Sequence, residues 1–386
     1  MKITEVETAW IRMPLPRSRG LSGGPITHST DAVCRITTAG GLQGIGEARG
    51  GPLDQICQII DTALRPILLG GHAAETEVLW RTMHDLLLGP EASEHSWRPR
   101  TVLAAIAAVD LALWDIKAKA ADLSMCRLLG GRPDGVDAYL SDAFYSEDQP
   151  LEEIAAEAAG SVADGGFSAL KVRIGRDPDD DVRRVRAFRQ AVGDGVDLMA
   201  DVNQAWDLSR AQATLPRLEP FDLTWLEEPN PVRRDTEDFS APDRLSGRIA
   251  ALTAIPLASG ENHKTLAECR SLLENAPLRF MQFDATKNGG LTEFLRVAAL
   301  SQAHGILLAP HHAPHFHVQL AAAMPNGHIV EVFVNAKQHV AWPDLFPGFP
   351  DVRGGKMWFS PDAPGWGMEI NDELIDRHGV KVRWSR

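Results

Sequence analysis

The 386-residue sequence contains only four cysteines, Cys34, Cys57, Cys126 and Cys269, and no two of them form a Cys-x-x-Cys pair. Single scattered cysteines match neither the ligand spacing of a zinc site nor the disulfide framework of a small secreted protein. We therefore interpret them as free thiols and expect an intracellular, cytoplasmic protein.

Long apolar runs and runs of basic residues are also missing. No stretch reaches the roughly 20 apolar residues of a membrane-spanning helix, and residues 1–16 alternate like a strand, without the apolar centre of a signal peptide. The sequence has 39 Lys and Arg against 52 Asp and Glu, a formal net charge of −13. Because nucleic acids bind to basic faces, we expect neither a nucleic acid nor a membrane as a partner.

Residues 1–125 predict an α+β domain. Two strand-like stretches, 3–11 and 31–38, precede a Gly-rich turn at 39–47, which indicates a small antiparallel sheet. Helical periodicity follows in 101–120, where apolar residues recur at Val102, Ile106, Val109, Leu113 and Ile116. A sheet followed by helices is typical of an α+β module.

From about residue 135 onward, apolar runs of strand length alternate with helical stretches. Parallel strands buried on both faces explain why these runs are apolar without alternation. The repetition predicts an α/β fold, a (β/α) TIM-type barrel of seven or eight units over 126–350, with 351–386 packing back on the first domain. A doubly wound open sheet is the alternative, but no Gly-rich dinucleotide motif follows the first strand. The runs are 167–173, 196–204, 223–229, 255–262, 278–287, 305–312 and 328–333, with 139–144 as a further candidate.

Three successive runs end in a carboxylate: Asp201, Glu227 and Glu261. Each alone is more simply a helix cap or a solvated loop residue. In a barrel, however, the carboxyl ends of the strands converge on one mouth, where three neighbouring carboxylates would repel one another without a cation. The pattern predicts a divalent-metal site, and Mg²⁺ suits oxygen ligands with room for water and substrate.

The next two runs end in Asp284 and His311, which neighbouring strands would bring within hydrogen-bonding reach. Such a dyad holds the imidazole in one tautomer and lets it act as a base and then as an acid. A zinc cluster built from the four histidines of 311–317 is the alternative. Pro310 and Pro314 interrupt the helical spacing that such a cluster would need.

Lys171 and Arg173 alternate with Val172, so both side chains point to one side of their strand. Two inward cations opposite the carboxylates would bind an anionic substrate and stabilise its developing charge. Removing a proton next to a carboxylate creates a dianionic enediolate. A divalent metal and a lysine would reduce the free-energy cost of forming this dianion, and His311 would take the proton.

At these residues the sequence resembles the enolase superfamily, in particular its mandelate racemase branch. The joint motifs are the Gly44–Ala48 turn, the Lys-x-Arg strand, Asp-x-Asn at Asp201, LEEP at Glu227, SGEN at Glu261, FDATKNGG at Asp284 and the His311 strand. The resemblance implies three metal ligands and the dyad at the positions named above. It further implies Lys171 near the substrate carboxylate, Glu331 as a strand-end acid that hydrogen-bonds the enediolate, and Asn203 and Lys287 as residues lining the site.

The resemblance also implies that the first domain caps the barrel, with loops near 17–28 and 47–52 closing over its mouth. Candidate substrate contacts in the cap are Arg17, Arg19, His28, Arg49 and Trp97. They suggest a polar, hydroxylated substrate, although each is also explained as an ordinary surface residue. By analogy with the family we expect a homo-oligomer.

One departure from the family pattern decides the expected reaction. Arg173 occupies the place of the second lysine, the base on the opposite face of the substrate, and arginine is a poor base because it stays protonated. We therefore predict an acid-sugar dehydratase acting on a small anionic hydroxy acid, with His311 as the base and then the acid. The alternatives are a racemase, epimerase or lactone cycloisomerase that uses Lys171, and a non-catalytic binding or regulatory barrel.

Overall fold

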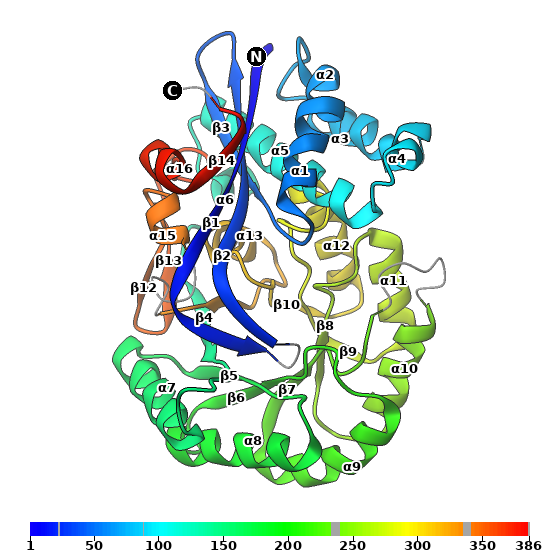
Figure 1. Cartoon of the computed structure of the whole chain (residues 1–386), viewed down its shortest axis with the longest axis vertical. Coiled ribbons are helices and arrows are strands. Elements are labelled where there is room, and N and C mark those ends of the chain that lie inside the picture. Colours follow the sequence, from blue (N-terminus) through cyan, green and yellow to red (C-terminus); the bar gives the residue numbers. More distant parts are fainter. Residues whose placement is uncertain (22–23, 88, 233–239, 335–340, 385–386) are drawn as a thin grey trace.

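The computed structural model describes residues 1–21, 24–87, 89–232, 240–334 and 341–384. Within these residues, no helix is both long and apolar enough to cross a membrane. Figure 1 shows two parts, one built mainly from the N-terminal strands and helices and one in which strands alternate with outer helices. We call the first part the cap; it comprises β1–β3, α1–α5 and β14.

The cap is a four-stranded antiparallel sheet in the order β14-β1-β2-β3. Its longest helix, α5 (Pro99–Ala120), packs so closely on β3 that a Cβ atom at Gly46 would lie only 1.9 Å from the carbonyl oxygen of Ala108. Glycine is therefore required for this approach of helix and strand. The strands are β1 (Ile3–Leu21), β2 (Gly24–Thr38), β3 (Gln43–Ala48) and β14 (Gly379–Arg383). The smaller helices are α1 (Leu53–Ile59), the π-helix η1 (Ile60–Leu64), α2 (Arg65–Leu68), α3 (Thr76–His84), the 3-10 helix η2 (Asp85–Leu87) and α4 (Pro90–Glu94).

The second part is the predicted barrel. Parallel pairing runs from β4 through β10 in sequence order, and β11 pairs with β4. A parallel bridge between Leu308 and Gly327 joins β10 to the segment leading into β11, so the strand order returns to its start. The strands are β4 (Val136–Ala143), β5 (Ala169–Arg173), β6 (Asp197–Asp201), β7 (Leu223–Glu227), β8 (Leu257–Ser259), β9 (Leu278–Met281), β10 (Leu307–Leu308) and β11 (Ile329–Val332).

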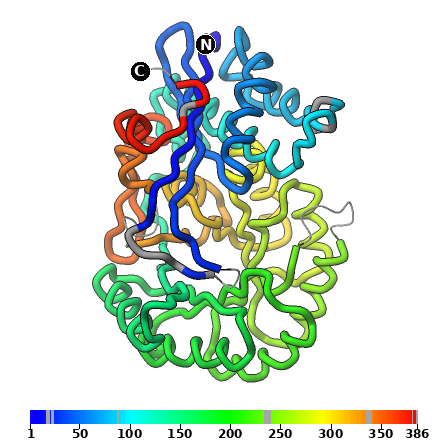
Figure 2. Tube along the Cα trace, in the orientation of Figure 1, coloured from blue at the N-terminus to red at the C-terminus, as the bar shows by residue number. Residues whose placement is uncertain are grey.

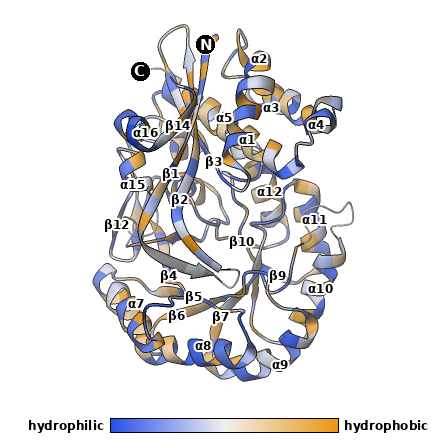
Figure 3. Cartoon of the chain, viewed as in Figure 1, coloured by the Kyte–Doolittle hydropathy of each residue, from blue (hydrophilic) through white to orange (hydrophobic). Residues whose placement is uncertain are grey.

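Helices between consecutive strands cover the outside of the barrel. In α13 every residue from Pro314 to Ala321 is buried, whereas much of the outer α8 is hydrophilic in Figure 3. Local sequence starts the helix there: Asp177 accepts hydrogen bonds from the backbone of Asp179 and Asp180, and Pro178 occupies the first turn. The helices are α7 (Leu151–Gly165), α8 (Pro178–Val192), α9 (Leu208–Leu218), α10 (Ser240–Ala250), α11 (Leu266–Asn275), α12 (Gly290–Ala303) and α13 (Pro314–Ala323).

The long β1–β2 hairpin of the cap reaches the barrel, where Gly20 exchanges backbone hydrogen bonds of 2.8 and 3.0 Å with Tyr145. Within the cap, β14 from the C-terminal part of the chain pairs with β1 (Figure 2). The remaining elements are α6 (Met125–Leu128), the 3-10 helix η3 (Glu219–Phe221), α15 (Trp342–Leu345), β12 (Asp351–Arg353), β13 (Lys356–Trp358) and α16 (Asp372–His378).

The barrel interior begins with an apolar layer to which every strand, or the residue following it, contributes one side chain. Tyr139 and Phe280 pack against the Trp225 ring with centroid distances of 5.2 and 4.9 Å. This layer closes the barrel, which is therefore a packed core and not a channel. Its members are Tyr139, Ala169, Met199, Trp225, Ala258, Phe280, Ala309 and Ile329.

Candidate active site

Two residues beyond each member of the apolar layer, a second layer points to the same side of the sheet, because side chains alternate along a strand. It replaces apolar side chains by charged and polar ones. The layer lies at the carboxyl ends of the strands, where active sites of such barrels occur. Its members are Ser141, Lys171, Asp201, Glu227, Gly260, Gln282, His311 and Glu331.

Lys171 lies at the centre of this layer and is fully buried. Its Nζ atom is 2.7 Å from Glu227 Oε1, 2.9 Å from Glu331 Oε1 and 3.8 Å from Asp201 Oδ2. A buried ammonium group is costly without such partners. The three carboxylates therefore stabilise the buried positive charge of Lys171.

Arg173 projects from the same strand one layer higher and is 5% exposed. It forms an ion pair with Asp201, and its Nη2 donates hydrogen bonds to Ser141 Oγ at 3.0 Å and Glu331 Oε1 at 3.3 Å. Both predicted cations of this strand thus point inward. Arg173 is bound to carboxylates and is not free in the cavity.

The three predicted metal ligands come from adjacent positions. Asp201 and Glu227 are register partners on β6 and β7, and Glu261 follows β8. Each carboxylate contacts a side-chain cation or His311, and no preformed group of three metal-binding side chains occurs in the described residues. Carboxylate oxygens nevertheless suit a hard divalent ion, and of the three carboxylates Glu261 lines the cavity.

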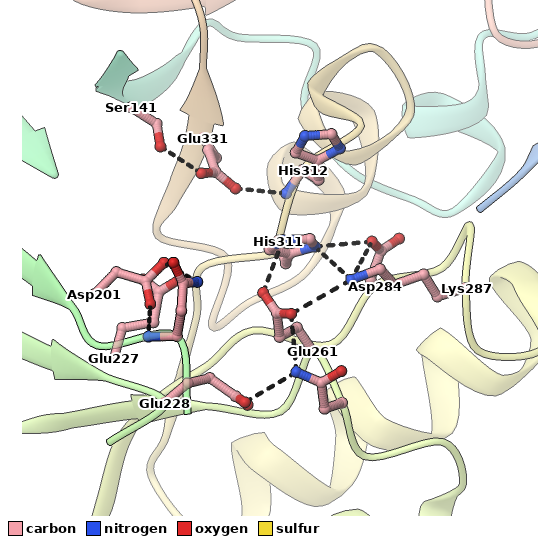
Figure 4. Close-up of polar contacts among 12 residues, drawn as sticks. Ser141, Asp201, Glu227, Glu228, Glu261, Asp284, Lys287, His311, His312 and Glu331 are labelled. Atoms are coloured by element: carbon pink, nitrogen blue, oxygen red, sulfur yellow. Dashed lines mark hydrogen bonds and ion pairs between the residues drawn. The ribbon is translucent and has the colours of Figure 1, made fainter. Parts of the chain in front are cut away.

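The Asp284–His311 dyad forms as predicted. His311 Nδ1 lies 3.0 Å from Asp284 Oδ2, and Nε2 lies 2.7 Å from Glu261 Oε2 (Figure 4). Burial alone would raise the pKa of Asp284, but the hydrogen bond from His311 and the charge of Lys287 hold it well below its usual range. Burial lowers the pKa of His311, yet Glu261 and Asp284 outweigh this effect and raise it.

Lys287 is a cation that lies beside the Asp284–His311 dyad. Its Nζ is 3.4 Å from Glu261 Oε1 and 3.3 Å from His311 Nδ1. Asn203, in a left-handed backbone conformation with φ of 49°, donates hydrogen bonds to Asp201 from its backbone and its side chain. Both residues line the cavity, as predicted.

The cavity lies between the barrel mouth and the cap and has a volume of about 320 Å³, a size suited to a small ligand. Cap residues form one wall and strand-end residues the other. Its lining is Ile26, Thr30, Arg49, Gly50, Gly51, Leu53, Phe144, Arg173, Asn203, Glu261, Lys287, His311, His312 and Phe333.

Two family models match the chain: "Mandelate racemase / muconate lactonizing enzyme, N-terminal domain" over residues 3–130, and "Enolase C-terminal domain-like" over residues 153–374. The second match alone spans more than half of the chain.

This chain belongs to the mandelate racemase/muconate lactonizing enzyme family of the enolase superfamily.

Similar members of this family differ in the reactions named for them. The chain is 31% identical to 3,6-anhydro-alpha-L-galactonate cycloisomerase from Streptomyces coelicolor, covering 98% of this chain and 99% of that protein. It is 30% identical to L-talarate/galactarate dehydratase from Salmonella typhimurium, covering 93% and 86%. The solved structure of L-talarate dehydratase from Polaromonas sp. JS666, complexed with Mg and L-glucarate, matches with a TM-score of 0.83 and 31% identity over 100% of each chain.

The cap residues that were predicted to contact the substrate fall into three groups. Arg49 lines the cavity. His28 and Trp97 do not belong to its described lining; His28 contacts Thr27, and Trp97 stacks on His95 with a centroid distance of 4.6 Å. The side chains of Arg17 and Arg19 lie outside the part of the structure that is described.

Sequence reasoning missed two polar residues of the site. His312 follows His311 and lines the cavity. Ser141 accepts a hydrogen bond from Arg173 and donates one of 2.6 Å to Glu331 Oε1. For Ser141 a signal was available, since it lies two residues after the inward-facing Tyr139 on the first strand.

Proposed function

We propose that this protein is a Mg²⁺-dependent acid-sugar dehydratase that converts an aldonate or aldarate into a 2-keto-3-deoxy acid. One observation supports dehydration over racemisation. The cavity has a histidine–aspartate dyad on one side, whereas Arg173, which stays protonated and is paired with Asp201, replaces a second lysine. A single base is sufficient for dehydration.

The proposed ligands of the metal are Asp201, Glu227 and Glu261, whose oxygen donors suit Mg²⁺. When bound, Mg²⁺ supplies positive charge that lowers the cost of the enediolate. The L-talarate dehydratase of Polaromonas, complexed with Mg and L-glucarate, supports this assignment.

In the proposed reaction His311 Nε2 removes the proton α to the substrate carboxylate, and Asp284 stabilises the resulting imidazolium. Lys171, buried beside the carboxylates, stabilises the negative charge on the substrate. The imidazolium then gives its proton to the β-hydroxyl group, which leaves as water. The enol that remains tautomerises to the 2-keto acid.

Glu331 has a different proposed role from the one that the family resemblance implies. Burial favours its neutral form, but Lys171, His311 and Arg173 outweigh burial and hold its pKa well below the usual range. An ionised carboxylate accepts hydrogen bonds and cannot donate one to an enediolate. We therefore propose that Glu331 orients Lys171 and Arg173.

The test is an assay for 2-keto acids with purified protein, Mg²⁺ and a panel of aldonic and aldaric acids. The critical variant is His311→Asn, and the matched control is His304→Asn, because His304 is exposed at the end of α12. We expect keto acid from the wild type and the control and none from His311→Asn. If no acid in the panel yields keto acid and none exchanges its α-proton in D₂O, the proposal is wrong.

A cycloisomerase or racemase is the second candidate, favoured by the 31% identity to 3,6-anhydro-alpha-L-galactonate cycloisomerase. In that case Lys171 would act as the partner of His311. Deuterium at the α-carbon without loss of water, measured by NMR in the same samples, would support it over the dehydratase.

A further inference from the structure

The cap wall of the cavity contains an arginine that the proposed reaction does not use. Arg49 lies in the loop that joins β3 to α1, and it faces the dyad side of the cavity together with Gly50 and Gly51. Among the described lining residues, cations outnumber carboxylates: Arg49, Arg173 and Lys287 stand against Glu261. Arg173, however, is bound to Asp201 and Glu331, and Lys287 contacts Glu261, so Arg49 is the cation that the cap wall offers to a ligand.

Arg49 is held next to both halves of the dyad. Its backbone N–H donates to the carbonyl of Thr286 at 3.1 Å, two residues after Asp284. Its Nη1 donates to His312 Nδ1 at 2.5 Å, one residue after His311. The Arg49 side chain therefore lines the cavity from the cap side.

The contact with Arg49 also determines the tautomer of His312. Arginine is always a donor, so His312 Nδ1 accepts, and a neutral His312 carries its proton on Nε2. The backbone N–H of His312 donates to Glu331 Oε2 at 2.7 Å, which holds the residue in place above His311 (Figure 4).

Among the described residues, the carboxylates make only loose contacts with the guanidinium group. Its Nε lies 3.4 Å from Asp31 Oδ1 and 3.9 Å from Glu47 Oε1, longer than the roughly 2.7–2.9 Å of a charge-assisted hydrogen bond. Burial raises the pKa of Asp31 to about 6 and that of Glu47 to about 7 although Arg49 opposes it, so the pair carries less than two full charges near neutral pH. The Trp342 ring, 4.8 Å away, supports the flat face of Arg49.

We propose that Arg49 binds the second carboxylate of the substrate, which makes the substrate an aldarate, a sugar acid with a carboxylate at each end. This inference rests on the proposed function. One carboxylate of the aldarate lies on the barrel wall of the cavity, and the other accepts hydrogen bonds from the guanidinium group on the cap wall, for which a planar carboxylate is the matching partner.

The test compares matched pairs of acids that differ only at the distal carbon, such as galactarate with galactonate and glucarate with gluconate. For each pair, kcat/KM for keto acid formation or α-proton exchange is measured on the wild type, Arg49→Gln and Arg49→Lys. Arg81→Gln is the matched control, because Arg81 lies on the cap helix α3, 66% exposed and paired only with Glu77 among its described ion pairs.

We expect the wild type and Arg81→Gln to prefer the aldarate of a pair. Arg49→Gln should lower kcat/KM for the aldarate by about 10²-fold and for the aldonate by less than about tenfold, since a hydrogen bond to a charged group is lost only with the aldarate. Arg49→Lys should restore part of the preference. The ratio is measured on one protein preparation, so partial unfolding does not change it.

Two results would overturn the inference. A wild type that dehydrates aldonates and not aldarates would leave the proposed function standing and remove this one. An Arg49→Gln variant that loses both activities equally would show that Arg49 only supports the cap. If the wild type acts on no acid of the panel, the proposed function itself fails.

Discussion

The two layers inside the barrel differ in almost every physical property, although each strand supplies both. The lower layer, around Trp225 and Phe280, is apolar and packed ring against ring. The upper layer, two residues further along each strand, contains Lys171 with carboxylates around it and His311 at the cavity. Stability and chemistry are thus encoded at alternate positions of the same strands, a few ångströms apart.

This arrangement shows why the charged layer can exist at all. Buried charges cost several kcal/mol unless they are paired, so a charged layer requires a rigid base and partners in fixed positions. The apolar layer supplies that base, and Trp225 links the two, since its Nε1 donates a 3.1 Å hydrogen bond to Glu227 Oε2.

Substituting His311 in the upper layer should give the largest loss of activity with little change in stability. His311→Asn should reduce α-proton exchange by about 10³-fold, because His311 is the proposed base that takes the α-proton. The melting temperature should change little, since His311 is partly exposed in the cavity, with 13% of its side chain accessible. Exchange in D₂O and a thermal melt on the same sample measure both; a variant that unfolds instead would contradict this expectation.

Phe280→Ala should have the opposite profile. Truncating a phenylalanine in a packed core costs about 3–5 kcal/mol of unfolding free energy, through lost burial and the cavity that remains. Urea denaturation gives the cost, and kcat of the remaining folded protein should stay within a few-fold of the wild type. A large loss of kcat at full folding would mean that the lower layer also positions the reacting groups.

Trp225→Phe tests the link between the layers. The ring packing is largely kept, while the hydrogen bond to Glu227 is lost. If Glu227 is a metal ligand, Mg²⁺ affinity should fall by about tenfold, as for other groups that orient a ligand. Titration calorimetry with Mg²⁺ measures it, and Trp358→Phe, which removes a hydrogen bond to Arg353 remote from the site, is the matched control. Unchanged Mg²⁺ affinity would mean that Glu227 is not a metal ligand or that the hydrogen bond from Trp225 does not orient it.

Gln282 should show the smallest effect. It belongs to the upper layer and is fully buried, yet neither its amide nitrogen nor its carbonyl oxygen has a hydrogen-bond partner among the described residues. Gln282→Met replaces an unpaired polar side chain by an apolar one of similar volume. The free energy of unfolding should therefore change by less than about 1 kcal/mol or rise slightly. A clear loss of activity with unchanged stability would instead give the amide a functional role.

Much of this arrangement was predictable from the sequence because it depends on strand ends. Asp201, Glu227, Glu261, Asp284 and His311 terminate apolar runs, and one topological rule brings such ends together. Both cations of β5 followed from simple alternation. The barrel and the α+β cap followed from repeated strand and helix lengths.

Other features depend on contacts between distant parts of the chain and leave no local pattern. The Arg49–His312 contact joins residues 263 positions apart, and it requires the cap loop to dock beside α13. Ser141 and Gln282 occupy inward positions that alternation predicts, but a neutral polar residue alone does not indicate a site. The pairing of each carboxylate with a particular cation is decided by side-chain geometry, which no sequence pattern records.

The pairing of β14 with β1 has a consequence for the order in which the molecule is made. Thr8 pairs with Arg383, so a ribosome releases every strand of the barrel before the residues that complete the cap sheet. Such distant pairings form late because loop closure must precede them. Until then β1 is an unprotected edge of the sheet. The cap sheet can therefore be completed only after residue 383 has been synthesised.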